Sequence, residues 1–162
     1  LVCGGFPCQP FSTASRGRRL GTEDDRFLWP EMLRLVSETR PTWVIGENVA
    51  GLTPMEIQQV VADLEAEGFD TVVMEIQACA TLKDHWRPRN WFLGYSDSNS
   101  KSVSPVNAEV AVLQRREHGP GQPRGADGVS KGLDGLRRKA LGNAVVPQIP
   151  ELIGRAIMEA AQ

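Results

Sequence analysis

The stretch Thr42-Trp43-Val44-Ile45-Gly46, together with the segment Thr53-Pro54-Met55-Glu56 that follows it, decides the fold class of this chain. The first segment is a short apolar run, which predicts a buried strand over residues 42–46. In the second, Thr53 and Glu56 have the spacing of a capping box, and the proline stands at the first helical position. The sequence therefore predicts a strand and then a helix that runs to Gly68, with an apolar face of Met55, Val60, Val61 and Leu64.

Strands and helices alternate on both sides of this unit. Further strands are expected at Leu1–Cys3, Thr71–Ile76 and Trp91–Tyr95. An earlier helix is expected after the acidic Glu23-Asp24-Asp25, which would lie at the positive end of the helix dipole. This helix is expected to bury Leu28, Met32, Leu35 and Val36. A closing helix is expected to bury Ile149, Leu152, Ile153, Ala156, Ile157 and Ala160. This alternation predicts an α/β layered sheet, in which ligands bind at the carboxyl ends of the strands.

The composition is that of an ordinary globular protein. The 162 residues suffice for one domain, with 41% hydrophobic and 23% charged residues and a net charge of −2. No apolar run approaches the roughly 20 residues that span a bilayer, and the start of the chain lacks a signal-peptide pattern. We therefore expect a soluble, cytoplasmic protein in a reducing environment, without a membrane partner.

Basic residues gather in two segments whose charge suits contact with phosphate. Arg16, Arg18 and Arg19 lie within residues 1–19, which hold no acidic residue. Residues 111–139 hold seven basic residues against three acidic ones. The alternative interpretation is a solvated charged surface, because the chain as a whole is weakly acidic.

The three cysteines have irregular spacing, which predicts neither a disulfide framework nor a metal site. Cys3 and Cys79 lie in apolar runs and are expected in the core. Cys8 differs, because Gly5-Phe6-Pro7-Cys8-Gln9-Pro10-Phe11-Ser12 places its thiol on a turn rich in glycine and proline beyond a strand end. Cys8 is therefore a candidate nucleophile, the alternative being a thiol packed as a small hydrophobe.

Three more segments carry candidate site residues. Glu47-Asn48-Val49 follows the strand ending at Gly46 and would bring a carboxylate to the rim that holds Cys8. In His85-Trp86-Arg87-Pro88-Arg89, two arginines two residues apart on an extended segment point the same way, which suits recognition of a planar oxygen. Alternatively, the glutamate is solvated and the arginines decorate an edge strand. Leu141-Gly142-Asn143-Ala144-Val145-Val146-Pro147-Gln148 forms a Gly-Asn turn ahead of the closing helix.

These four segments, in this order, resemble the motifs of the DNA (cytosine-5)-methyltransferase family. They match, in order, the family's Pro-Cys loop, its Glu-Asn-Val motif, its Gln-x-Arg-x-Arg motif and its Gly-Asn-x-Val segment. In the third motif, His85 stands in place of glutamine. The resemblance implies a partial Rossmann-like S-adenosylmethionine-dependent methyltransferase sheet with flanking helices. Residues 1–95 would be the catalytic part, 96–136 a polar insertion and reduced target-recognition region, and 137–162 a segment returning to the catalytic domain.

The resemblance also implies a reaction and a set of roles. A methyl group would pass from S-adenosylmethionine to C5 of a cytosine flipped out of duplex DNA, in a prokaryotic or phage-infected cell. Cys8 would add to C6, Glu47 would support N3, Arg89 would hold O2 and Arg87 would order the pocket. The expected substrate-binding residues are Gln9, Ser12, Arg16, Arg18 and Asn48. The expected cofactor-binding residues are Pro7, Asn143, Ala144 and Val145, and no metal is implied.

Two departures from the family leave alternatives open. The Phe-x-Gly-x-Gly loop of the family's cofactor-binding half does not occur in this sequence, and the chain starts at Leu1 within an expected strand, so we expect a piece of a longer protein. One alternative is a non-catalytic or split fragment with residual DNA binding, whose cofactor-binding half comes from a separate chain. Another is an unrelated thiol enzyme that uses Cys8 with His85 as its base.

Overall fold

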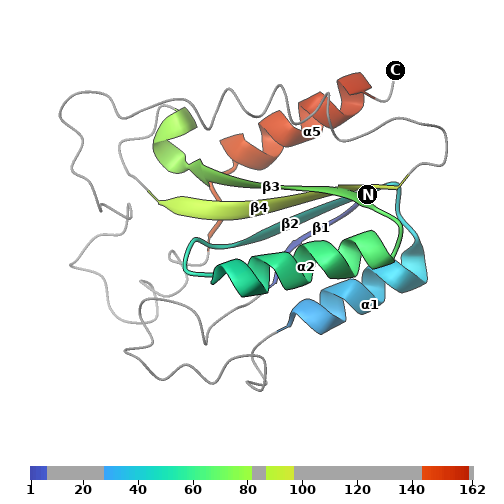
Figure 1. The fold of residues 1–162 in the computed structure, drawn as a ribbon. Coiled ribbons are helices and arrows are strands. Elements are labelled where there is room, and N and C mark those ends of the chain that lie inside the picture. The colour runs from blue at the N-terminus through green and yellow to red at the C-terminus, as the bar shows by residue number, and fades with distance from the viewer. Residues whose placement is uncertain (7–27, 82–86, 97–143, 161–162) are drawn as a thin grey trace. The chain divides into compact units, whose positions relative to one another are not determined.

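The computed structural model describes residues 1–6, 28–81, 87–96 and 144–160 of the chain. Within these ranges the elements follow the order β1, α1, β2, α2, β3, η4, β4 and α5 (Figure 1). The chain divides into two compact units, one of Leu1–Glu75 with Arg89–Ser104 and the other of Ile76–Pro88 with Pro105–Gln162. The helices α1 and α2 belong to the first unit, and η4 and α5 belong to the second.

A mixed sheet with the strand order β1-β2-β4-β3 is the framework of the fold. Strand β1 (Val2–Gly5) runs parallel to β2 (Trp43–Val49), and β2 runs antiparallel to β4 (Pro88–Tyr95). This order places β4 between β2 and β3 (Asp70–Gln77), and residues 90–95 of β4 are all buried. The predicted α/β class is confirmed, and each predicted strand is present with bounds that differ by a few residues.

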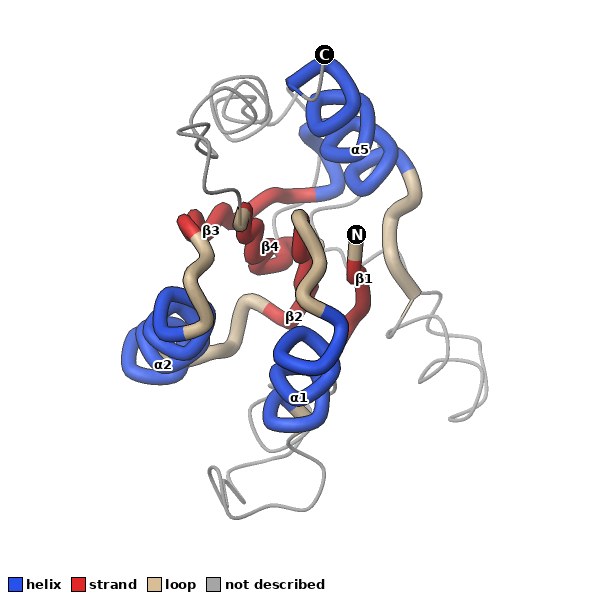
Figure 2. Tube along the Cα trace, turned by 90° about the vertical axis from the view of Figure 1, so that its right-hand side faces the viewer, coloured by secondary structure: helices blue, strands red, loops and turns tan. Residues whose placement is uncertain are grey.

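Helices α1 (Trp29–Thr39) and α2 (Pro54–Ala66) lie on the same side of this sheet (Figure 2). The start of α2 confirms the predicted capping box. The backbone N–H of Glu56 donates to Thr53 Oγ1 at 3.3 Å, and the backbone N–H of Thr53 donates to Glu56 Oε2 at 2.6 Å. Two N–H groups that a helix terminus leaves without an intrahelical partner are thereby satisfied.

The core of the first unit is built around three aromatic rings. The Phe6 ring lies 5.0 Å from that of Trp29 and 5.6 Å from that of Phe92, both in tilted arrangements. Gly46 makes this packing possible, because a Cβ at its position would lie 3.2 Å from Phe6 Cε1. Phe6 directly precedes Pro7 and Cys8, so this cluster fixes the point at which the predicted catalytic segment begins.

Parts of the predicted helix faces are wrong. Met32, Val36, Val60 and Leu64 are buried as expected, but Leu28, Leu35, Met55 and Leu152 are exposed. Leu28 caps α1 rather than lying within it, and Met55 stands in the first turn of α2, where its side chain is 78% exposed. Periodicity assigns too wide an apolar face to these helices. It also overlooks Trp29, which is almost fully buried at the start of α1.

The prediction that Cys3 belongs to the core is also wrong. Cys3 does lie in strand β1, but Cys3, Gly4 and Gly5 are exposed. The reason is the strand order, which places β1 at an edge of the described sheet. An apolar run at a sheet edge has the same sequence pattern as one at the centre.

In the second unit, the 3₁₀ helix η4 (Ala78–Thr81) packs against α5 (Gln148–Ala160). Ile149, Ile153, Ala156 and Ile157 are the buried residues of α5, while Ala160 is half-buried. Cys79 is buried in η4, as predicted, and burial raises the pKa of its thiol. A raised pKa favours the protonated thiol, which is a weak nucleophile.

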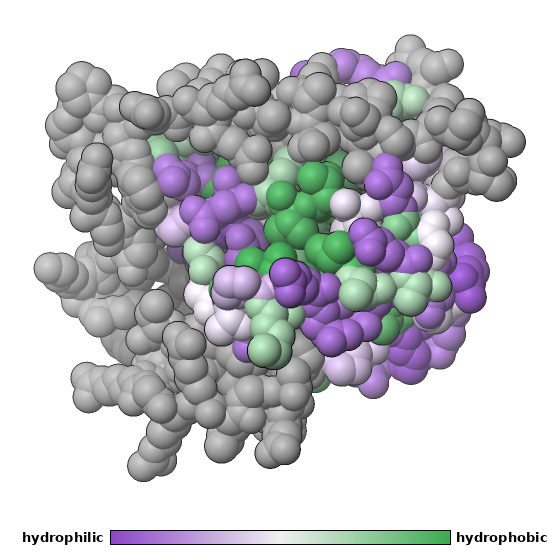
Figure 3. Space-filling view, in the orientation of Figure 1, coloured by the Kyte–Doolittle hydropathy of each residue, from purple (hydrophilic) through white to green (hydrophobic). Residues whose placement is uncertain are grey.

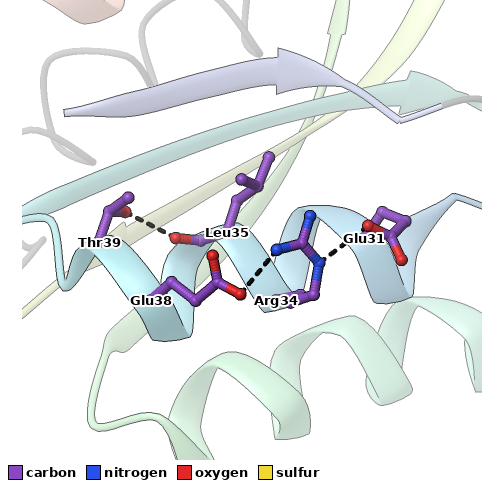
Figure 4. A network of polar contacts seen from close by, with 5 residues as sticks. All are labelled: Glu31, Arg34, Leu35, Glu38 and Thr39. Carbon is purple, nitrogen blue, oxygen red and sulfur yellow. Dashed lines mark hydrogen bonds and ion pairs between the residues drawn. The ribbon is translucent and has the colours of Figure 1, made fainter.

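The outer surfaces of the first unit's helices are polar. On α1, Arg34 Nη1 lies 2.7 Å from Glu38 Oε1 and Arg34 Nε lies 3.0 Å from Glu31 Oε2 (Figure 4). The hydrogen bonds to Glu38 and Glu31 raise the pKa of Arg34. Hydrophilic side chains also cover much of the surface over α2 (Figure 3). None of the helices in the described ranges is long and apolar enough to cross a membrane.

Candidate active site

The candidate site lies where β1 and β2 end and β4 begins. Because β1 and β2 are parallel, their carboxyl ends meet at one edge of the sheet, where Gly5 stands opposite Glu47. Because β4 is antiparallel to β2, its first residues reach the same edge, and Arg89 stands opposite Val49. Glu47-Asn48-Val49 was predicted to follow a strand ending at Gly46, but it forms the last three residues of β2.

The main polar contact at this edge is an ion pair between Glu47 and Arg89. Arg89 Nε lies 3.0 Å from Glu47 Oε1, and the two side chains are 17% and 13% exposed, respectively. Glu47 and Val49 project from the same face of β2, and Arg89 stands across from Val49, so the pair is a diagonal contact between neighbouring strands. The structure thus brings together two of the four predicted catalytic residues.

Gly5 provides the space that the Glu47 carboxylate occupies. A Cβ atom on residue 5 would lie 3.1 Å from Glu47 Oε2, closer than most Cβ contacts in proteins. The other carboxylate oxygen, Oε1, is held by Arg89 at the same time. Gly5 was not among the predicted site residues. The sequence places Gly5 in a glycine-rich turn before Pro7. Its close approach to Glu47 depends on the register between β1 and β2, which the sequence does not reveal.

Replacing Gly5 with alanine is expected to displace the Glu47 carboxylate without unfolding the protein. The added methyl group would meet the end of a side chain rather than backbone, so we expect a change in the free energy of unfolding of less than about 1 kcal/mol. We expect the distance between Glu47 and Arg89 to increase, which a crystal structure of Gly5→Ala would measure. Gly4→Ala is the matched control, because a Cβ at Gly4 meets nothing within 4 Å. An unchanged ion pair in Gly5→Ala would contradict this role for Gly5.

Arg87 does not lie on the extended segment that the prediction assumed for both arginines. Arg87 has a φ of +37°, a value uncommon for a residue other than glycine, and it precedes the first residue of β4. Its buried guanidinium donates from Nη2 to the carbonyl oxygen of Ala144, within the second unit. The positive φ of Arg87 departs from the extended backbone on which residues two apart share a face.

Ala144 and Val145, predicted to contact a cofactor, are exposed residues just before α5. The Ala144 carbonyl is the one that Arg87 holds, so the two predicted motifs that contain Arg87 and Ala144 are connected in the structure. Nearby in sequence, the side-chain Oε1 of Gln148 is a buried acceptor with no donor in the described part of the chain.

Asn48 is almost fully buried beside Glu47. Its Oδ1 accepts a hydrogen bond from the backbone N–H of Val49 at 2.8 Å, while its Nδ2 finds no acceptor among the described residues. The proposed substrate contact of Asn48 stays a prediction. Opposite it on β4 stands Asn90, a buried polar residue that sequence reasoning overlooked. An asparagine inside a strand is unusual, and that was the available signal.

Several predicted site residues lie outside the described ranges. They are Pro7, Cys8, Gln9, Ser12, Arg16, Arg18 and Asn143, together with His85 and the basic residues of 111–139. Their roles stay predictions.

The carboxyl group of Glu47 and the guanidinium of Arg89 can each take part in a reaction. A carboxyl group can donate or accept a proton, and a guanidinium donates hydrogen bonds in a fixed plane. Glu47 and Arg89 lie side by side at the rim of the sheet, so a group that can exchange a proton and a planar hydrogen-bond donor stand together there.

Comparison with known proteins gives consistent matches. Residues 1–120 match the family model described as C-5 cytosine-specific DNA methylase. The chain is 52% identical over 52 residues to the type II methyltransferase M.NgoMIV of Neisseria gonorrhoeae, covering 32% of this chain and 16% of that protein. It is 40% identical over 81 residues to M.PspPI of Psychrobacter sp. (strain TA137), covering 47% and 19%, and 30% identical over 108 residues to M.DsaV of Dactylococcopsis salina, covering 64% and 30%. The chain thus matches less than a third of the length of each relative.

Proposed function

Because this chain belongs to the C-5 cytosine-specific DNA methylase family, we propose that it provides the part of a DNA (cytosine-5)-methyltransferase that activates the target base. The observation that carries the proposal is the Glu47–Arg89 ion pair at the edge shared by β1, β2 and β4. The relatives are named type II methyltransferases, which supports the same reaction class.

The substrate of the proposed reaction is a cytosine taken out of the duplex, because C5 and C6 cannot be reached inside the base stack. Cytosine presents N3 and the O2 carbonyl next to each other on its Watson–Crick edge. Glu47 in its protonated form would donate a hydrogen bond to N3, while Arg89 would donate to O2. The spacing of these two side chains in the structure supports this assignment, because a single ring edge spans two neighbouring polar groups.

In the proposed chemistry, the Cys8 thiolate forms a bond to C6 and the electrons of the C5–C6 double bond move to C5. Glu47 and Arg89 stabilise the charge that develops at N3 and O2. S-adenosylmethionine would supply the methyl group that C5 takes up, and S-adenosylhomocysteine would leave as the bond between its sulfur and that carbon breaks. A base then removes the C5 proton, the electrons re-form the C5–C6 double bond, and Cys8 leaves as thiolate. The Cys8 thiolate is regenerated, so the protein ends each cycle unchanged.

The described residues before α5 fit a role in holding S-adenosylmethionine. The molecule carries an ammonium group, ribose hydroxyls and an adenine amino group, all of which are donors. Gln148 Oε1 is a buried acceptor with no donor among the residues that the structure describes, and Ala144 and Val145 are exposed next to it in sequence. These residues are the ones that we assign to the cofactor, and Arg87 would hold their segment in place through Ala144.

Cys8→Ala is expected to abolish methyl transfer, a loss of about 10³-fold or more, because no other group in the proposed mechanism forms the bond to C6. The measurement is transfer of labelled methyl from S-adenosylmethionine to duplex DNA. It is made with this chain alone and with the chain joined to the cofactor-binding half of a relative, because the chain matches only part of its relatives.

Cys3→Ala is the matched control for Cys8→Ala. Cys3 is an exposed thiol on β1, five residues before Cys8 in the sequence, and it contributes nothing to the proposed mechanism. Full transfer by Cys3→Ala and none by Cys8→Ala would support the assignment. Transfer that survives Cys8→Ala, or that is missing in every form of the wild-type protein, would count against the proposed function.

A further inference from the structure

The side chain of Asn90 connects β4 to the last residue of β2 beside the candidate site. Asn90 is 4% exposed, and its Nδ2 donates to the carbonyl oxygen of Val49 at 3.2 Å. Asn90 directly follows Arg89, and Val49 lies two residues beyond Glu47. The hydrogen bond therefore joins the two strands at the level of the ion pair.

Arg89 forms the last pair of the ladder between β2 and β4, opposite Val49. The first residue of β4, Pro88, has no N–H and cannot donate to the ladder of hydrogen bonds between the strands. The residue before it, Arg87, has a positive φ and leaves the extended conformation. The pairing between β2 and β4 therefore ends at Arg89, and the Asn90 side chain makes its hydrogen bond next to this end.

The ion pair between Glu47 and Arg89 depends on the register between β2 and β4. Arg89 stands opposite Val49, and Glu47 is its diagonal neighbour on the same face. A shift of one residue would place these side chains on opposite faces of the sheet. The Asn90 side chain opposes such a shift, because its hydrogen bond is made to the last residue of β2.

Burying an asparagine at this position costs free energy, and packing in the apolar core gives no reason for an amide here. Asn90 lies on the same face of β4 as Phe92, which packs in the apolar core with Phe6 and Trp29. A buried amide needs hydrogen-bond partners, and an apolar side chain of similar size would satisfy this environment without any. Asn48, directly across from Asn90, brings a second buried amide to the same place.

We propose that Asn90 is a positioning residue, which holds Arg89 and Glu47 in the register that the proposed cytosine contacts require. This inference rests on the proposed function for its catalytic meaning, although its structural part stands on the Asn90–Val49 hydrogen bond. Asn90 touches no reacting atom in this scheme. It acts through Val49 on the end of β2 and through the backbone of β4 on Arg89.

The test compares Asn90→Leu with Val60→Ala. The leucine variant keeps the size of the side chain but removes the donor to Val49. Val60 is a fully buried core residue of α2 that makes no contact in this scheme, so Val60→Ala controls for a general loss of stability. In both, nuclear magnetic resonance measures the exchange of the Arg89 Nε–H with water, since this N–H group lies against Glu47.

We expect Nε–H exchange to become about tenfold faster in Asn90→Leu and to change little in Val60→Ala. In the form of the protein that transfers methyl groups, we expect the kcat of Asn90→Leu to fall about tenfold, while KM for DNA changes less than twofold. Unchanged exchange in Asn90→Leu would overturn the inference, and so would an equal acceleration in both variants. If Asn90→Leu does not fold, Asn90→Ser allows the same comparison, because its hydroxyl is too short to replace the amide.

The exchange measurement separates this inference from the proposed function. If the wild-type protein transfers no methyl group in any form, the proposed function fails, but Nε–H exchange still shows whether Asn90 holds the ion pair. If transfer occurs and Asn90→Leu leaves both exchange and kcat unchanged, the proposed function stands and the role of Asn90 is wrong.

Discussion

Replacing Arg89 with leucine is expected to lower the free energy of unfolding by about 3 kcal/mol and to stop methyl transfer. The loss of stability follows from the partial burial of the pair, since Glu47 is only 13% exposed and would lose the cation beside it. The loss of activity follows from the proposed contact of Arg89 with O2 of the cytosine. Urea denaturation measures the first effect, and transfer of labelled methyl measures the second.

The double variant Glu47→Gln/Arg89→Leu distinguishes these two effects. Removing both charges leaves no buried ion without its partner, so we expect the free energy of unfolding to return to within about 1 kcal/mol of the wild-type value. Methyl transfer should not return, because neither group that contacts the base is then present. Recovery of activity together with stability would mean that the pair serves the fold alone.

Replacing Trp29 with alanine is expected to lower the free energy of unfolding by about 4 kcal/mol, the largest single effect in the core. Trp29 is 2% exposed, and its ring packs against Phe6. Its Nε1–H also donates to Asp63 Oδ2 at 2.8 Å, which joins α1 to α2. A loss of this size is a large part of the stability of a typical domain, so a substantial unfolded population is expected on mild heating.

Trp29→Phe is the matched control for this prediction. Phenylalanine keeps an aromatic ring against Phe6 and removes the donor to Asp63, which should cost only about 1 kcal/mol. Thermal unfolding followed by circular dichroism measures both variants. If Trp29→Ala and Trp29→Phe lose the same stability, the hydrogen bond to Asp63 would be the main contribution and the aromatic packing a minor one.

The sequence predicted the elements of the fold well because the signals for them are local. The capping box at Thr53 and Glu56 and the apolar run before it involve residues close together in the chain, and both are present in the structure. Burial was predicted less well, because it depends on which strands lie at the edge. Cys3 and Leu35 have apolar neighbours in sequence and are exposed all the same.

In the candidate site, too, the local motifs could be predicted from the sequence, but the contacts between distant segments could not. Glu47 and Arg89 were both selected from their motifs, but their contact arises from antiparallel pairing between strands that are distant in sequence. The contrast between Arg87 and Arg89 depends on one positive φ angle, which the extended pattern before Trp91 does not reveal. Gly5 and Asn90 matter only through neighbours across the sheet, so the sequence alone does not indicate their roles.

The exposed position of Cys3 at the sheet edge has a practical consequence for work on the proposed nucleophile. An accessible thiol reacts with alkylating reagents and can link two molecules by a disulfide in air. Loss of activity after treatment with such a reagent would therefore not identify Cys8. Chemical modification of this protein should start from a Cys3→Ala background under reducing conditions, where burial and a raised pKa slow the reaction of Cys79.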